Sequence, residues 1–140
     1  MSNCDINQII RKDPAAVQDY PNYVANKLAS TTDPFMFFRS FVPCFYCVLD
    51  QDITWNSPAF RKIRQFEGWC VGDAHPGNFG VLPLYPTSGD PKLVFTANDA
   101  DDGTRGLPVY DILRLLTGIN YLNVQYNPND LICAYLSGLR

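Results

Sequence analysis

The apolar positions in the first part of the chain follow a helical repeat. Asp13-Pro14 is typical of an N-cap followed by a first helical turn. Apolar side chains then recur at helical spacing: Ala15, Val17, Tyr20, Val24 and Leu28. The polar run 31–34 ends this repeat. The apolar run 35–38 is equally compatible with a strand and with a buried helix, whereas 40–49 favours another helix despite Pro43.

The pattern changes at Gly68. The short apolar run 69–71 predicts a strand, and it leads into 72–78, which is too rich in Gly, Pro and Asn to be regular structure. Two further apolar runs, 79–82 and 92–95, flank a turn-rich segment and predict a β-hairpin. The second strand of this hairpin leads directly into an acidic loop at 98–102.

The remainder of the chain is predicted to be helical. Pro108 begins an amphipathic helix that extends to about Tyr126, and the apolar segment 131–139 follows it. The apolar stripe of the first helix consists of Ile112, Leu115, Leu116, Ile119 and Leu122. The whole pattern predicts an α+β fold, with a mostly helical part over 1–66 and a loop-bearing part over 67–140. In this second part a small hairpin over 79–95 holds both loops at one edge, and the C-terminal helices follow.

Composition narrows the class of protein. The 140 residues are 46% hydrophobic and 18% charged, so we expect one globular domain over 1–140. The net charge of -3 argues against binding nucleic acid by bulk charge. No stretch has the length of a membrane span, and the first residues lack the features of a signal peptide. We therefore expect no membrane partner and a cytoplasmic location.

Five cysteines, an odd number, favour reduced thiols over a disulfide framework. Cys44 and Cys47 form a C-x-x-C pair in an apolar run that has no second pair of ligands. A zinc or redox role is therefore weaker here than the interpretation as small buried side chains.

Acidic and amide side chains follow two strands that are predicted to be neighbours. Asp73 and Asn78 lie in the first loop, and the second loop carries Asp99, Asp101 and Asp102. Oxygen ligands of this kind suit magnesium, and the five-residue spacing of Asp73 and Asn78 suits phosphoryl transfer. In that chemistry an Asp orients the attacking hydroxyl, while an Asn and a second Asp hold metal ions. The alternative is that these turn-forming residues only make solvated loops.

The motifs themselves resemble a known group of enzymes. G-D-A-H-P-G-N-F-G at 72–80, N-D-A-D-D at 98–102 and G-L-P-V-Y-D at 106–111 resemble the catalytic core of aminoglycoside and choline phosphotransferases, which have a protein-kinase-like fold. Within that group, an uncharacterised bacterial family carries P-F-x-F-x-R, G-D-A-H-x-x-N-F-G and N-D-F-D. The first of these occurs here at 34–39, and Ala100 replaces the usual Phe of the third. The resemblance covers 33–140.

This resemblance implies roles for individual residues. Asp73 corresponds to the catalytic base, and Asn78 and Asp99 correspond to metal ligands, with Asp101 as an additional ligand. His75 is a second candidate for catalysis, although its counterparts usually brace the loop. Asn78 would also contact the nucleotide cofactor.

Two further residues have open interpretations. Arg39 could bind a nucleotide phosphate as a bidentate donor or pair with an acidic side chain. Asp111, at the start of the predicted helix, is expected to cap or hydrogen-bond the first loop and not to touch substrate.

The resulting functional prediction is an ATP- and magnesium-dependent phosphotransferase with an unidentified hydroxyl acceptor. The sequence contains neither G-x-G-x-x-G nor a Walker-type phosphate loop, so we expect a partial kinase-like fold, the N-terminal part of a larger domain. The alternative is a non-catalytic fragment that binds nucleotide, metal or a partner. The apolar surface of the C-terminal helices would then be covered by a homo-oligomer or by a missing C-terminal part.

Overall fold

The computed structural model describes residues 23–52 and 54–138. The chain forms two compact units that meet in the sequence between Lys62 and Ile63, and each unit is described by itself. The predicted helix start at Asp13-Pro14 lies outside the described residues.

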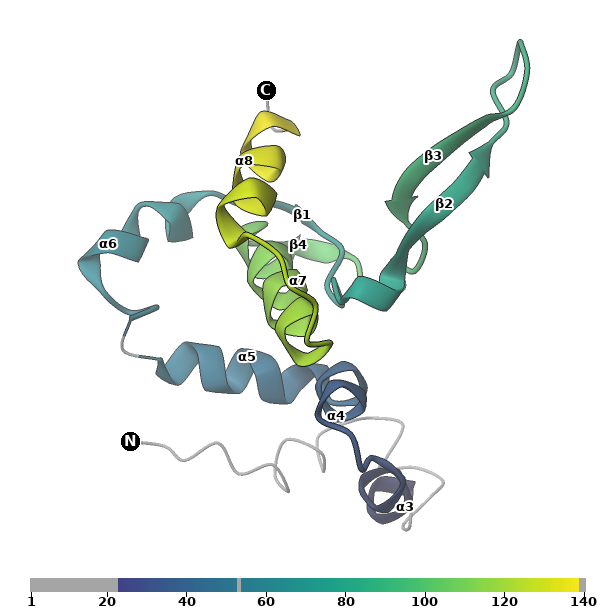
Figure 1. Cartoon of the computed structure of the whole chain (residues 1–140). Helices are drawn as coiled ribbons and strands as arrows, with labels where there is room; N and C mark the ends of the chain where they lie inside the picture. Colours follow the sequence, from purple (N-terminus) through teal and green to yellow (C-terminus); the bar gives the residue numbers. More distant parts are fainter. Residues whose placement is uncertain (1–22, 53, 139–140) are drawn as a thin grey trace. The chain divides into compact units, whose positions relative to one another are not determined.

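The first unit is helical in its described part (Figure 1). It contains α3 (Tyr23–Ser30), α4 (Pro34–Ser40), α5 (Val42–Gln51) and α6 (Pro58–Arg61). The ambiguous run 35–38 belongs to α4, because the Asp33 side chain accepts a hydrogen bond from the Met36 N–H and so caps the helix. The predicted helix over 40–49 is confirmed as α5. Pro43 is tolerated because it lies in the first turn, where its missing N–H has no helical partner.

The cysteines of this unit differ from one another. Cys44 and Phe41 form a small buried core, against which Leu28 and Phe37 pack. Cys44 is free, and burial raises the pKa of its thiol, which supports the interpretation as a small buried side chain. Cys47 is disulfide-bonded, so the expectation of reduced thiols throughout was wrong at this position.

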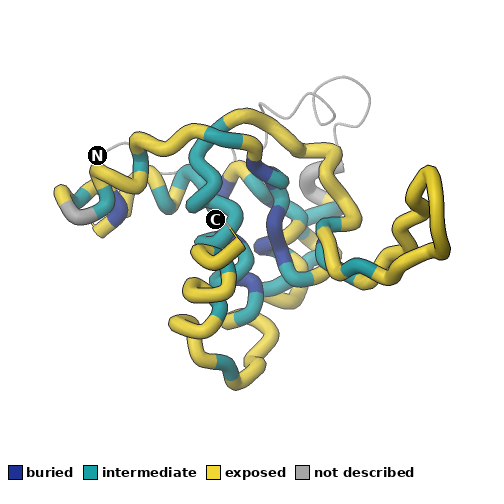
Figure 2. The backbone as a smooth tube through the Cα atoms, turned by 90° about the horizontal axis from the view of Figure 1, so that it is seen from above, coloured by how far each residue is buried: buried dark blue, intermediate teal, exposed yellow. Residues whose placement is uncertain are grey.

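The second unit contains two small antiparallel sheets of two strands each. The strands are β1 (Gly68–Cys70), β2 (Phe79–Leu84), β3 (Lys92–Ala97) and β4 (Thr104–Gly106). The predicted hairpin is confirmed as β2 and β3, with Phe79 opposite Ala97. The pairing of β1 with β4, with Cys70 opposite Thr104, was not predicted, because β4 is a three-residue strand without an apolar run. Figure 2 shows the hairpin as mostly exposed.

Two helices complete the second unit, α7 (Val109–Tyr121) and α8 (Pro128–Gly138). The predicted helix from Pro108 to about Tyr126 ends earlier, because Asn123 adopts a positive φ of 56°, which a helix does not continue through. The most buried positions of α7 are Arg114 and Gly118, whereas Leu122 of the predicted apolar stripe is exposed. Among the described helices, none has the length and apolar character that crossing a membrane requires.

Candidate functional site

Two loops of the second unit are held next to each other by the strands on either side of them. We call residues 71–78 the Asp73 loop and residues 98–103 the Asp99 loop. The Asp73 loop connects β1 to β2, and the Asp99 loop connects β3 to β4. Because β1 pairs with β4 and β2 pairs with β3, the loops are joined at both ends. At the hairpin end, the Asn98 N–H donates to the Asn78 carbonyl over 3.0 Å.

Gly72 is the point of closest approach between these loops. Its φ of +89° lies in the region that favours glycine, and an added Cβ would lie 2.2 Å from the backbone carbonyl oxygen of Asp102. The Asp99 loop has little room to move away, because it is itself closed by a hydrogen bond from the Gly103 N–H to the Ala100 carbonyl. The glycine of the G-D-A-H motif thus allows the two backbones to touch.

We predict that Gly72→Ala lowers the free energy of unfolding by about 2 kcal/mol or more, because it adds both backbone strain and overpacking. Chemical denaturation measures this effect. Gly89→Ala is the matched control, since Gly89 has a similar φ of +96° but nothing within 4 Å of an added Cβ. Equal losses for both variants would mean that backbone strain alone matters and that the contact with Asp102 does not.

Asp111 holds the start of the Asp73 loop from the first turn of α7. Its Oδ2 accepts the Val71 N–H at 2.7 Å, and its Oδ1 accepts the Gly72 N–H at 3.1 Å. This confirms the expectation that Asp111 hydrogen-bonds the loop. Burial raises the pKa of the Asp111 carboxyl, and the two N–H donors only partly oppose that rise. Burial and the nearby Asp111 also raise the pKa of Cys70 on β1 and of Tyr135 on α8.

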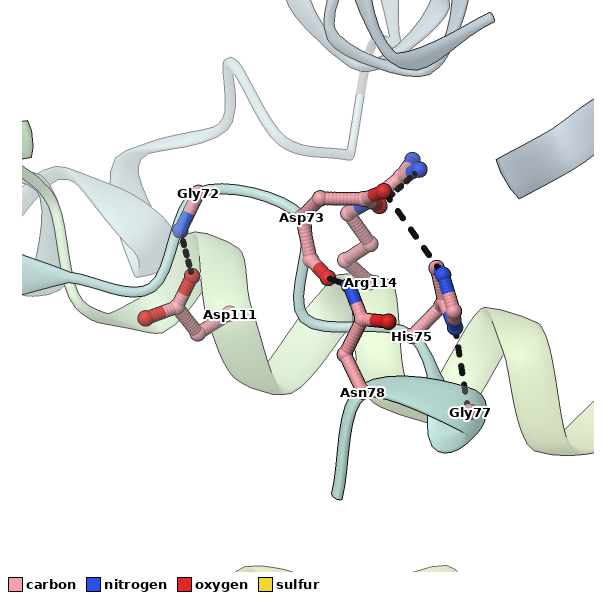
Figure 3. Close-up of polar contacts among 7 residues, drawn as sticks. All are labelled: Gly72, Asp73, His75, Gly77, Asn78, Asp111 and Arg114. Atoms are coloured by element: carbon pink, nitrogen blue, oxygen red, sulfur yellow. Dashed lines mark hydrogen bonds and ion pairs between the residues drawn. The ribbon is translucent and has the colours of Figure 1, made fainter. Parts of the chain in front are cut away.

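Arg114 holds the carboxylate of Asp73, one helical turn beyond Asp111 (Figure 3). Its Nε donates to Asp73 Oδ1 at 2.7 Å, and its Nη2 lies 2.5 Å from the same oxygen. The Arg114 side chain is 0% exposed, so the carboxylate is the counter-charge of a buried guanidinium. This contact fixes the rotamer of Asp73 and leaves its other oxygen, Oδ2, on the side away from the guanidinium bonds.

His75 is buried at 2% exposure and is bonded within its own loop. Its Nδ1 accepts the Gly77 N–H at 3.0 Å, which assigns the proton of the neutral ring to Nε2. That Nε2 lies 3.6 Å from Asp73 Oδ2, beyond normal hydrogen-bond distance. These contacts favour the bracing role of His75, and its role in catalysis stays a prediction.

Asn78 is buried and oriented by the same loop. Its Nδ2 donates to the Asp73 carbonyl at 2.9 Å, which directs the amide oxygen Oδ1 away from that bond (Figure 3). Oδ1 is the atom of an asparagine that binds a hard cation. Asp99 follows directly on Asn98, whose N–H is bonded to the Asn78 backbone. The backbone of Asn78 is therefore bonded to the residue directly before Asp99.

The other predicted site residues are placed as follows. Asp99 and Asp101 are exposed in the turn after β3. Arg39 is exposed in the last turn of α4, in the first unit, so its contact with a phosphate stays a prediction. Within residues 23–52 and 54–138, no group of three or more His, Cys, Asp or Glu side chains is arranged to hold a metal ion.

Sequence reasoning missed Arg114, although the sequence carries a signal for it. Arg114 is a charged residue within the apolar stretch 112–116, three positions after Asp111 and therefore on the same side of the helix. A charge at such a position needs a buried partner, and Asp73 is that partner. The helical pattern indicated the leucines of the apolar stripe as core residues, but Leu115 and Leu116 are only partly buried and Leu122 is exposed.

Comparison with known proteins places these residues in a family. The model of the family described as "Uncharacterized protein conserved in bacteria (DUF2252)" matches residues 21–125, a segment that includes both loops and all of α7. No curated protein and no solved structure matches the chain significantly.

Proposed function

The chain belongs to the DUF2252 family of bacterial proteins, and we propose that it is an ATP- and magnesium-dependent phosphotransferase acting on a hydroxyl acceptor. The observation that carries the proposal is the joining of the two loops at both ends by β1–β4 and β2–β3. Phosphoryl transfer requires an Asp at the attacking hydroxyl and metal ligands from a second segment, in fixed relation to each other. The paired strands supply that relation.

The donors in the loops fit magnesium. Asn78 offers an oriented amide oxygen, and Asp99, which follows the Asn98 bonded to Asn78, offers an exposed carboxylate, with Asp101 two residues further on. Magnesium takes few protein ligands and keeps water and phosphate oxygens in its remaining positions. Asn78 and Asp99 would hold the ion, which supplies positive charge next to the phosphate oxygens when bound.

Asp73 would orient the acceptor. Its Oδ1 is held by Arg114, so Oδ2 is the oxygen that would accept the hydrogen bond of the acceptor hydroxyl. The buried guanidinium holds the carboxylate in a fixed orientation, which suits positioning of the hydroxyl. His75 would limit the movement of this carboxylate from the opposite side.

The proposal has two further parts. The order strand, Asp73 loop, hairpin, Asp99 loop, strand and helix agrees with a partial protein-kinase-like fold, on the motifs quoted above. The cytoplasm, which supplies ATP, is the location that such an activity requires. The acceptor is proposed only as a hydroxyl group.

We predict that titration calorimetry detects binding of ATP with magnesium and that Asp99→Ala abolishes it, because a metal-bridged phosphate loses a charged ligand. Asp73→Asn keeps the shape of the side chain, so under conditions in which this less stable variant remains folded it should spare binding and lower turnover by about 10²–10⁴-fold. Asp90→Ala, an exposed change in the hairpin tip, is the control and should leave both unchanged.

The outcomes separate the candidate functions. If the chain binds ATP but transfers the γ-phosphate neither to water nor to any acceptor in a panel of hydroxylated compounds, then it is a nucleotide-binding module and not an enzyme. Equal affinity of the wild type and Asp99→Ala for ATP with magnesium would show that Asp99 is not a metal ligand. No binding of ATP with magnesium would refute the proposed function and leave a partner-binding fragment.

A further inference from the structure

The β2–β3 hairpin has an apolar face that the described residues leave open. Residues that lie directly opposite each other share a face, so Val81 and Phe95 lie on one side together with Pro83 and Leu93. On this side Val81 is 60% exposed, Phe95 is 73% exposed and Leu93 is 76% exposed. A two-stranded hairpin with such a face is marginally stable by itself. It therefore favours an additional strand.

The register shows which backbone groups are available on β3. The Asn98 N–H donates to the Asn78 carbonyl, so residues 78 and 98 stand at a hydrogen-bonding position of the ladder, and such positions recur at every second residue pair of antiparallel strands. Thr96, Val94 and Lys92 therefore point their N–H and C=O groups toward β2. The N–H and C=O groups of the alternate residues point outward, away from β2. These residues are Leu93, Phe95 and Ala97. Within 23–52 and 54–138, no hydrogen bond reaches these outward groups.

The two edges of the hairpin are not equivalent. On β2 the outward positions are Phe79, Val81 and Pro83, and Pro83 has no N–H to donate. Proline on an edge strand is a known protection against pairing with another strand. β3, with the sequence KLVFTA, has no proline, and its centre consists of Val94, Phe95 and Thr96, which favour strands. The edge of β3 is therefore the open one.

We propose that two copies of this chain associate through the outer edges of their β3 strands, which pair antiparallel in a four-stranded sheet. The register with the most hydrogen bonds places Phe95 opposite Phe95 of the partner subunit. Leu93 then lies opposite Ala97 of the partner subunit, and the reverse pair follows by two-fold symmetry. All outward N–H and C=O groups of the three residues are paired in this register.

Charge favours the antiparallel direction and a second copy as the occupant. β3 begins with the cation Lys92 and is followed by the anion Asp99. In this antiparallel register Lys92 lies opposite Asn98 of the partner subunit, one residue before Asp99, whereas parallel pairing in register would place Lys92 opposite Lys92 of the partner subunit. In the same register, the apolar faces of the two hairpins lie on the same side of the four-stranded sheet. This inference does not depend on the proposed phosphotransferase activity.

Sedimentation equilibrium of the 140-residue chain over a concentration series tests the proposal. We expect the mass to rise from that of one chain, 15.8 kDa, to that of two. Phe95→Lys and Phe95→Glu should each weaken the dimer by about tenfold or more, because like charges then face each other across the symmetry axis. An equimolar mixture of the two variants should associate again, which an unfolded variant could not do.

Val81→Lys is the matched control, since it places the same charge on the same face but on the edge of β2. It should leave the dimer intact. A wild-type chain that stays monomeric at every concentration would overturn the proposal. A Phe95→Lys variant that is as dimeric as the wild type would also overturn it. So would a Val81→Lys variant that dissociates as much as Phe95→Lys, because the contact would then use the apolar face of the hairpin and not the edge of β3.

Discussion

Arg114→Met is expected to lower the free energy of unfolding by about 3–5 kcal/mol, which is the usual cost of breaking a buried ion pair by removing one partner. The Arg114 guanidinium is fully buried and makes two contacts with Asp73 Oδ1. Its loss leaves the Asp73 carboxylate without a counter-charge. A domain of this size has a total stability of about 5–15 kcal/mol, so the loss is visible in any denaturation experiment.

A double-mutant cycle distinguishes the ion pair from simple packing. Asp73→Asn should also destabilise the protein, because it leaves the buried guanidinium without an anion. The double variant with Arg114→Met should then be more stable than the sum of the single losses predicts. Arg105→Met, an exposed change on β4, is the control and should be nearly neutral. Strictly additive losses would show that Arg114 acts by filling space.

Asp111→Ala is expected to cost about 2–6 kcal/mol, because it leaves the N–H groups of Val71 and Gly72 without an acceptor, at about 1–3 kcal/mol each. The Asp130→Ala variant tests the same change in the first turn of α8, where the side chain is exposed, and should have little effect. Similar losses in both variants would mean that Asp111 acts only as a helix-terminal charge.

Asp111 also predicts a dependence of stability on pH. Burial raises the pKa of its carboxyl above the usual value of 3.8, so the folded protein keeps this proton at pH values where the unfolded chain has lost it. Above pH 3.8, the contribution of Asp111 to stability therefore falls until the pH has passed the raised pKa. Denaturation of the wild type and Asp111→Asn over this range measures the difference in their free energies of unfolding, which should stay constant with pH if the pKa of the carboxyl is the same in the folded and unfolded chain.

The sequence predicts those elements whose signal is local. The hairpin was predicted because apolar runs flank a turn, and Asp111 was placed on the loop because it begins a helix after a proline. Asp33 would have resolved the run 35–38 as a helix, since it stands just before Pro34 as an N-cap. The early end of α7 depends on one positive φ at Asn123, which residue patterns indicate only weakly.

What the sequence could not predict depends on contacts between distant residues. β4 exists because it pairs with β1, and a three-residue segment that ends in glycine and has no apolar run does not predict a strand. Likewise, Arg114 becomes part of the site only when the Asp73 loop lies against α7. Residue types placed Asp73, Asn78 and Asp99 in two loops joined by a hairpin, but the β1–β4 pairing that joins the loops at their other end came from the structure.

The separate ladders also have a consequence for the order of folding. The β2–β3 pairing joins residues close in the sequence, so its hairpin closes a short loop and forms early. The β1–β4 pairing joins Cys70 to Thr104 and can form only after the chain between them has been brought together. The β1–β4 pairing, which sets the Asp73 loop against the Asp99 loop, should therefore form after the hairpin.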